Sequence, residues 1–184
     1  MQYTCSDELG NPSEPATTFI RPEDASCSGR EFPPPLYALL AGIAMFALNR
    51  YAPGPTLLGP PLRRWAWLIA ALGALMALWA AATFRQAHTT LDPTDPSKAS
   101  RLVTRGPFCF SRNPMYLGLL LALSGWAAWL GSLSPLAALP GFVIVVTFQQ
   151  IVPEERALEA RFGEPYARYR QRVRRWVGCV RAAR

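Results

Sequence analysis

Residues that soluble enzymes use for metal binding and nucleophilic catalysis are scarce in this sequence. It has one histidine, His88, and four cysteines without a CxxC spacing, so a zinc site is not expected. No G-x-G-x-x-G motif follows a predicted strand, so a soluble dinucleotide-binding fold is not expected either. The N-terminus has no basic segment followed by an apolar one, which argues against a cleavable signal peptide. Catalysis by a metal or by a nucleophile–base pair is therefore not indicated.

Charged residues are few relative to apolar ones and are separated from them along the chain. Apolar residues make up 51% of the 184 positions, and 19 Lys and Arg against 12 Asp and Glu give a net charge of +7. A basic soluble protein of this kind would suggest a nucleic-acid partner. Here the apolar residues form long runs with the charges between them. This pattern indicates a single-domain membrane protein whose partner is the lipid bilayer and not a nucleic acid.

Four apolar runs predict an all-α integral membrane protein with about four transmembrane helices, at residues 36–50, 65–84, 116–131 and 135–152. The run at 65–84 is the clearest, with 20 residues and no charge, and the third run carries small residues, Gly118, Ser124 and Gly125, that permit close helix packing. The first run has only 13 apolar residues, so a buried or re-entrant helix is the alternative there. Residues 1–35 are rich in Ser, Thr, Pro and acids and predict an irregular tail, which leaves 36–184 as the membrane domain.

The end of the chain predicts amphipathic helices over residues 153–176, divided in two at Gly163 and Pro165. One face carries apolar residues at helical spacing and the opposite faces carry arginines: Leu158, Phe162, Tyr166, Tyr169 and Val173 against Arg156, Arg161, Arg168, Arg170 and Arg172. Such helices lie on a membrane surface or cap a helical bundle. The fourth span, just before them, is expected to be interrupted at Pro140-Gly141.

The distribution of Lys and Arg predicts how the chain is oriented. Two precede the first span, five lie between the second and third spans, nine follow the last span, and three lie in the loop between the first two. The positive-inside rule therefore places the N- and C-termini of this multi-pass chain in the cytoplasm. It also places Arg112 and the pair Glu154-Glu155 at the same membrane face.

The segment Arg112-Asn113-Pro114-Met115-Tyr116 stands where the third span begins, and polar groups at that depth are costly unless they have partners. A functional site is one interpretation. The alternatives are structural: Asn113-Pro114 caps a helix, Arg112 extends to lipid phosphates, and Pro153-Glu154-Glu155 begins a helix with acids at its N-terminus. The occurrence of both motifs on one membrane face favours a site.

Together these residues resemble a known family. The run L-V-T-R-G-P-F-C-F-S-R-N-P-M-Y-L-G, a hydrophobic hairpin, E-E, and F-G-E-P-Y-A-R-Y-R-Q-R-V are similar to the isoprenylcysteine carboxyl methyltransferase and phospholipid methyltransferase family, over about 88–176. The resemblance implies a membrane enzyme that uses S-adenosyl-L-methionine. It implies a cofactor pocket at the cytosolic face, capped by the C-terminal helices. The methyl group would pass to a carboxylate or other nucleophile on a lipophilic small molecule or lipidated substrate. A bacterial inner membrane is the expected location.

The resemblance also implies roles for individual residues. Arg112 and Glu155 correspond to catalytic positions, and Gln150 to a substrate contact. The implied cofactor contacts are His88, Ser100, Arg101, Leu102, Val103, Phe108, Asn113, Pro114, Met115, Tyr116 and Glu154. His88 fits a solvated interfacial position equally well.

Three positions depart from the family pattern. Asn113 stands where eukaryotic members have histidine, Gln150 where prenylcysteine enzymes have arginine, and Arg101 where a small polar residue is usual. The cofactor expectation is unaffected, but the accepting atom stays open among carboxylate, amine and thiol. Two other functions remain alternatives: an NADPH-dependent membrane reductase related to sterol reductases, which carry additional spans, and a non-catalytic membrane scaffold.

Overall fold

The computed structural model describes residues 33–57, 59, 63–86 and 102–179. Every regular element within these ranges is helical, in agreement with the predicted all-α fold. In chain order the elements are α1 (Pro34–Tyr51), α3 (Ala66–Gln86), the 3-10 turn η3 (Gly106–Cys109), α4 (Pro114–Leu130), the 3-10 turn η4 (Ser134–Ala137), α5 (Ala138–Val146), the π-turn η5 (Thr147–Ile151), α6 (Val152–Phe162) and α7 (Glu164–Arg172). The tail predicted to be irregular up to residue 35 is two residues too long, because α1 begins at Pro34 with proline in its first turn.

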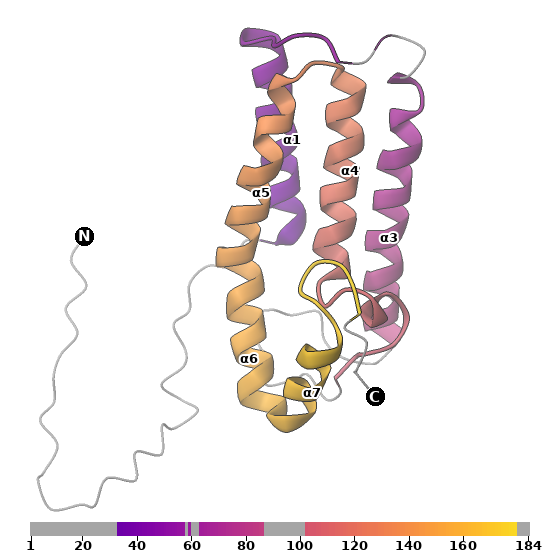
Figure 1. The fold of residues 1–184 in the computed structure, drawn as a ribbon, viewed down its shortest axis with the longest axis vertical. Coiled ribbons are helices and arrows are strands. Elements are labelled where there is room, and N and C mark those ends of the chain that lie inside the picture. Colours follow the sequence, from indigo (N-terminus) through magenta and orange to yellow (C-terminus); the bar gives the residue numbers. More distant parts are fainter. Residues whose placement is uncertain (1–32, 58, 60–62, 87–101, 180–184) are drawn as a thin grey trace, which may run out of the picture.

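The long helices α1, α3, α4 and α5 run alternately in opposite directions along the chain, and α4 lies between α3 on one side and α1 and α5 on the other (Figure 1). α4 packs most extensively on α3, and it also contacts α1 and α5. A hydrophobic core that includes Met45, Leu123 and Phe142 fills the space where α1, α4 and α5 meet. Below the bundle in Figure 1 lie α6, α7 and η3. The polar motifs singled out in the sequence are therefore gathered at one end of the bundle.

The close contact between α3 and α4 depends on three glycines. A Cβ atom at Gly73 would lie 2.4 Å from the backbone nitrogen of Ala122, and one at Gly125 would lie 2.4 Å from that of Ala70. A Cβ at Gly118 would approach the backbone nitrogen of Ala77 to 2.7 Å. The two backbones thus touch directly, as small residues allow in membrane helices. Gly118 and Gly125 were predicted to permit such packing, whereas Gly73 was not singled out.

The fourth span and the first C-terminal helix form one continuous helix, from Ser134 to Phe162. The prediction of an interruption at Pro140-Gly141 and of a separate helix starting at 153 was wrong. Pro140 lies in the first turn of α5, where its missing N–H costs nothing. Pro153 follows the π-turn η5, in which the N–H of Val152 bonds to the carbonyl of Thr147, so the helix continues past a residue that cannot donate.

The C-terminal helices divide where the sequence predicted. Gly163 has a positive φ of 53°, a conformation that favours glycine, and it separates α6 from α7. The predicted apolar face packs together: Tyr166, Tyr169 and Val173 are buried, and Leu158 and Phe162 lie against them. The helical pattern extends four residues too far, however, because α7 ends at Arg172 and Val173 is extended.

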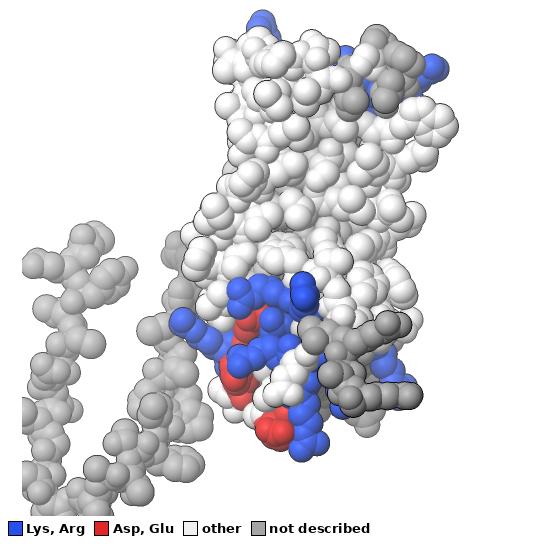
Figure 2. Space-filling view, in the orientation of Figure 1, with Lys and Arg blue, Asp and Glu red and all other residues white. Residues whose placement is uncertain are grey.

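On the face shown in Figure 2 the middle of the bundle carries no Lys, Arg, Asp or Glu, and the charged side chains gather toward its ends. Large apolar side chains such as Leu39, Phe46, Leu72 and Ile144 are exposed on α1, α3 and α5. An exposed apolar belt of this extent suits lipid better than water. Among the described helices, Ala66–Gln86 and Ser134–Phe162 are long and apolar enough to cross a membrane, and Pro114–Leu130 is apolar but shorter. The topology of four spans remains a prediction.

Candidate functional site

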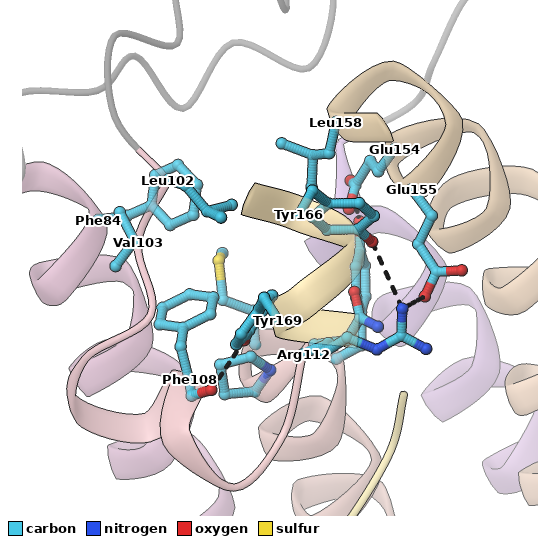
Figure 3. A pocket seen from close by; sticks show the side chains of 14 residues that line it. Phe84, Leu102, Val103, Phe108, Arg112, Glu154, Glu155, Leu158, Tyr166 and Tyr169 are labelled. Atoms are coloured by element: carbon cyan, nitrogen blue, oxygen red, sulfur yellow. Dashed lines mark hydrogen bonds and ion pairs between the residues drawn. The ribbon is translucent and has the colours of Figure 1, made fainter. Parts of the chain in front are cut away.

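A cavity opens where the first turn of α4 meets α6, α7 and the segment that precedes η3 (Figure 3). The volume of the cavity is about 110 Å³. Its lining comes from five separate parts of the chain and is mostly apolar, with a few charged and polar groups. The lining residues are Phe84, Leu102, Val103, Phe108, Arg112, Asn113, Pro114, Met115, Tyr116, Glu154, Glu155, Leu158, Tyr166 and Tyr169. An apolar cavity with a few converging polar groups is the usual form of a small-molecule site.

Arg112 and Glu155 form an ion pair in the wall of this cavity. The Nη1 atom of Arg112 lies 3.1 Å from Oε1 of Glu155, and both side chains are about nine-tenths buried, with 10% and 12% exposed. The same Nη1 donates a longer hydrogen bond of 3.5 Å to the hydroxyl of Tyr166. Figure 3 shows the Arg112 guanidinium lying between Glu155 and Tyr166. The two motifs that the sequence placed on one membrane face are therefore in direct contact.

A second arginine, Arg175, binds the same carboxylate. Its Nη2 and Nε atoms donate to Oε2 and Oε1 of Glu155 at 2.6 and 3.1 Å, a two-point contact of the kind arginine makes with carboxylates. The hydrogen bonds to Glu155 raise the pKa of Arg175 above its ordinary value. Glu155 is thus held by two cations. Arg175 was not among the predicted site residues.

One polar atom in this network is left without a partner. The Nε of Arg112 is buried and donates to no acceptor among the residues that the structure describes. A buried donor without an acceptor costs about 1–3 kcal/mol. An anionic ligand oxygen at this guanidinium would remove that cost, so the donor set fits a carboxylate-bearing molecule.

Asn113 occupies the N-cap position of α4, but its side chain makes no capping bond. Its Nδ2 instead donates to the carbonyl of Arg175 at 3.2 Å, and its backbone N–H donates to Oγ of Ser111 at 3.1 Å. The predicted helix start, with Asn113 at the N-cap followed by Pro114, is therefore confirmed, but the Asn113 side chain does not cap the helix. Its amide connects the start of α4 to the C-terminal residues.

Tyr116 connects the cavity to the π-turn. Its hydroxyl lies 2.6 Å from Oε1 of Glu154 and 3.4 Å from Oε1 of Gln150. Gln150 is 1% exposed and does not line the cavity, so the predicted substrate contact lies behind Tyr116. Gln150 also donates to the hydroxyl of Tyr37 on α1 at 3.5 Å. Gln150 and Glu154 are four residues apart on the continuous helix, so both side chains lie on one face and reach the same phenol.

Aromatic rings make up much of the remaining wall. Phe84 and Phe108 are in tilted contact with centroids 5.6 Å apart, and Tyr166 and Tyr169 with centroids 6.3 Å apart. The hydroxyl of Tyr169 donates to the carbonyl of Phe108 at 2.7 Å, which joins α7 to η3. Burial raises the pKa of Tyr166 and that of Tyr169 above their ordinary value, so both phenols are neutral at pH 7. Such rings present faces that attract a cation.

The structure brings together most of the predicted site residues. Those in the cavity wall are Leu102, Val103, Phe108, Arg112, Asn113, Pro114, Met115, Tyr116, Glu154 and Glu155. His88, Ser100 and Arg101 lie outside the described residues. The wall also includes Phe84, Leu158, Tyr166 and Tyr169, which sequence reasoning did not assign to the site. Leu158, Tyr166 and Tyr169 belong to the apolar face predicted for the C-terminal helices. The helical spacing of these residues was therefore visible in the sequence, but it was interpreted only as packing.

Comparison with known proteins places the chain in a family. The family model for phospholipid methyltransferases matches residues 62–165, which include most of the cavity wall. The chain is also similar to an uncharacterized protein of Haemophilus influenzae, with 46% identity over 63 residues, which is 34% of this chain and the whole of that protein. No solved structure matches the chain. The family match covers more than half of the sequence, so the protein belongs to the phospholipid methyltransferase family.

Proposed function

We propose that this protein is an integral membrane methyltransferase that binds S-adenosyl-L-methionine in the cavity and methylates a lipophilic substrate. The observation that carries the proposal is the meeting of Arg112, Tyr116 and the acids Glu154 and Glu155 in one aromatic-lined cavity at the charged end of an apolar bundle. Family membership supports the reaction class.

Each part of the cavity suits one part of the cofactor. Arg112, with its unpartnered Nε, would hold the carboxylate of the methionine portion. Glu154, positioned by Tyr116, would accept hydrogen bonds from the ammonium group or the ribose hydroxyls. Phe108, with the neutral phenols of Tyr166 and Tyr169, would pack on the adenine and face the sulfonium, a cation–π contact that contributes about 0.5–2 kcal/mol.

When bound, the cofactor supplies a methyl group on a positively charged sulfur. The chain's own residues align the two reactants and keep water out of the cavity. Orientation alone contributes up to about 7–11 kcal/mol in favourable cases. An acceptor that is already anionic needs no strong base, which agrees with a cavity wall that contains no histidine among the described residues.

The proposal includes the membrane topology of four spans with the cavity at the cytosolic face. The cluster of arginines around α6 and α7 in Figure 2 supports this orientation. A lipophilic substrate would then reach the cavity from the bilayer, and the cofactor would enter from the cytosol. The acceptor would be a carboxylate, as in isoprenylcysteine, or an amine or thiol on another lipophilic molecule.

Calorimetry on the detergent-purified protein tests cofactor binding. We expect S-adenosylhomocysteine to bind and NADPH not to bind. Arg112→Ala and Glu154→Ala should each weaken binding at least about tenfold, because each removes a charge-assisted contact. Arg168→Gln is the control, since Arg168 forms only an exposed pair with Glu164. Binding of NADPH alone would support the reductase alternative, and binding of neither ligand would support the scaffold. Parent-like binding by both alanine variants would overturn the site.

The accepting atom can be identified by radiolabel transfer from methyl-labelled cofactor to membrane extracts. Methyl esters release volatile methanol in base, whereas methylated amines and thioethers keep the label. Base-labile label in the lipid fraction would identify a carboxylate acceptor, and base-stable label an amine or a thiol. Absence of label transfer by a protein that binds the cofactor would contradict the enzymatic proposal.

A further inference from the structure

The last described residues, Val173–Cys179, form a strap that returns from α7 to the start of α4. The backbone N–H of Arg112 donates to the carbonyl of Arg174 at 3.1 Å, and that of Gly178 donates to the carbonyl of Phe110 at 2.8 Å. The strap also closes on itself, because the N–H of Arg174 donates to the carbonyl of Gly178 at 2.8 Å. These main-chain bonds fix the strap beside the residue that carries the cavity's buried cation.

Side chains of the α4 corner, which comprises residues 111–113 just before α4, hold the strap at Arg175. The carbonyl of Arg175 accepts from Nδ2 of Asn113 at 3.2 Å and lies 3.5 Å from Oγ of Ser111. Ser111 and Asn113 are both buried. Arg175 is thus fixed on its main-chain side while its guanidinium reaches Glu155. The strap lies beyond residue 165, where the match to the family model ends.

We infer that the strap is part of the binding site and that Arg175 is a positioning residue, which acts on Arg112 through Glu155. The inference rests on the proposed function, because it concerns how Arg112 meets a carboxylate of the ligand. Arg175 occupies Glu155 with two hydrogen bonds, so Arg112 makes only a single contact to it, through Nη1. The Nε of Arg112 is left over for another acceptor.

Removal of the Arg175 side chain changes this division of donors. Glu155 would then have lone pairs to spare next to Arg112, and arginine prefers to bind a carboxylate with two parallel N–H groups. Arg112 would turn to place both Nη1 and Nε on Glu155. The donor that now has no protein partner would be withdrawn from the ligand, although neither Arg112 nor Glu155 had been changed.

The first test needs no ligand. In the parent protein, Arg175→Gln should lower the apparent melting temperature measured in detergent. In a Glu155→Gln background the same change should have little further effect, because the partner of Arg175 is already gone. Arg168→Gln, which removes an exposed ion pair, should lower the melting temperature equally in both backgrounds. Equal losses for Arg175→Gln in the two backgrounds would overturn the inference.

The second test compares two ligands that differ only in the methionine portion. S-adenosylhomocysteine has its carboxylate and ammonium groups, and 5′-methylthioadenosine lacks both. We expect Arg175→Gln to weaken binding of the first about tenfold, which corresponds to about 1.4 kcal/mol, and to leave binding of the second unchanged. Arg175→Lys keeps the charge but cannot make the two-point contact, so it should behave like Arg175→Gln.

The outcomes separate this inference from the proposed function. Equal weakening of both ligands would show that the strap merely holds the cavity together, and no weakening of either would show that Arg175 has no influence on Arg112. Both results overturn the positioning role. A parent protein that binds neither ligand contradicts the proposed function and with it the role of Arg175 in ligand binding, and the melting temperatures then test only the coupling of Arg175 to Glu155.

Discussion

The contact between α3 and α4 makes a strong prediction about Gly125. Replacing it with alanine adds a Cβ that would lie 2.4 Å from the backbone nitrogen of Ala70 and 2.8 Å from the carbonyl oxygen of Ala66. Ordinary contacts are about 3.5–4.0 Å, so the helices must separate by roughly 1 Å. Overpacking of this kind typically costs about 1–3 kcal/mol. The obstacle is backbone on both sides, so side-chain rotation cannot relieve it.

Gly141→Ala is the matched control. Gly141 also lies inside a helix, α5, but a Cβ there would meet nothing within 4 Å. Alanine in a helix interior is about 0.5–1 kcal/mol more favourable than glycine, so this variant should be at least as stable as the parent.

Thermal unfolding in detergent, followed by circular dichroism at 222 nm, measures the difference. For a chain of this size 1 kcal/mol shifts the melting temperature by about 2–4 °C, so Gly125→Ala should melt several degrees below the parent and Gly141→Ala at or above it. Binding of S-adenosylhomocysteine should also weaken in Gly125→Ala, because Phe84, at the end of α3, lines the cavity. If Gly125→Ala melts with the parent, the direct backbone contact between α3 and α4 is refuted.

Two further predictions concern phenols. Tyr116→Phe removes the hydroxyl that lies 2.6 Å from Glu154, so binding of S-adenosylhomocysteine should weaken by about three- to tenfold, with the melting temperature nearly unchanged. The control Tyr51→Phe, at an exposed position, should alter neither quantity. Equal affinities in calorimetry would exclude a role for the Tyr116 hydroxyl. Burial raises the folded-state pKa of Tyr166 and Tyr169 above 10.0, so stability is complete below pH 10 and falls above it, where the unfolded chain releases protons that the folded chain retains. Absorbance at 295 nm should show these two tyrosines ionising at higher pH than the others. The loss of stability at alkaline pH should be smaller in a Tyr166→Phe, Tyr169→Phe double variant. Ionisation of every tyrosine in one step near pH 10 would show that neither is buried.

The sequence predicted which segments form the site but not how they interact. The helical class, the close packing at Gly118 and Gly125, and the shared end of Arg112 and Glu155 follow from hydropathy, residue size and the distribution of arginines. These are properties of single segments, or of the membrane, and they are visible without tertiary structure. Gly73 was missed because a small residue in an apolar run gives no sign of which neighbour it faces.

Interactions between distant segments could not be predicted. Arg175 is one of several arginines near the C-terminus, and nothing in its local sequence distinguishes it as the partner of Glu155. The π-turn at Thr147–Ile151 is also hidden, because proline at 153 is equally compatible with the start of a new helix. That ambiguity led to the wrong boundary at residue 153. Because the helix is continuous, Gln150 and Glu154 share one of its faces and both contact Tyr116, and the wrong boundary concealed this shared contact.

The two adjacent acids, Glu154 and Glu155, have different neighbours in this arrangement. Consecutive residues on a helix point about 100° apart, so Glu154 and Glu155 cannot share one environment. Glu155 faces Arg112 and Arg175, and its two oxygens accept from both guanidinium groups. Oε1 of Glu154 accepts a hydrogen bond of 2.6 Å from the hydroxyl of Tyr116. A carboxylate engaged by two arginines is well suited to hold α6, the α4 corner and the strap in place, because each guanidinium comes from a different segment. We therefore propose that Glu155, which was predicted to be catalytic, positions Arg112, while the predicted cofactor contact of Glu154 stays a prediction.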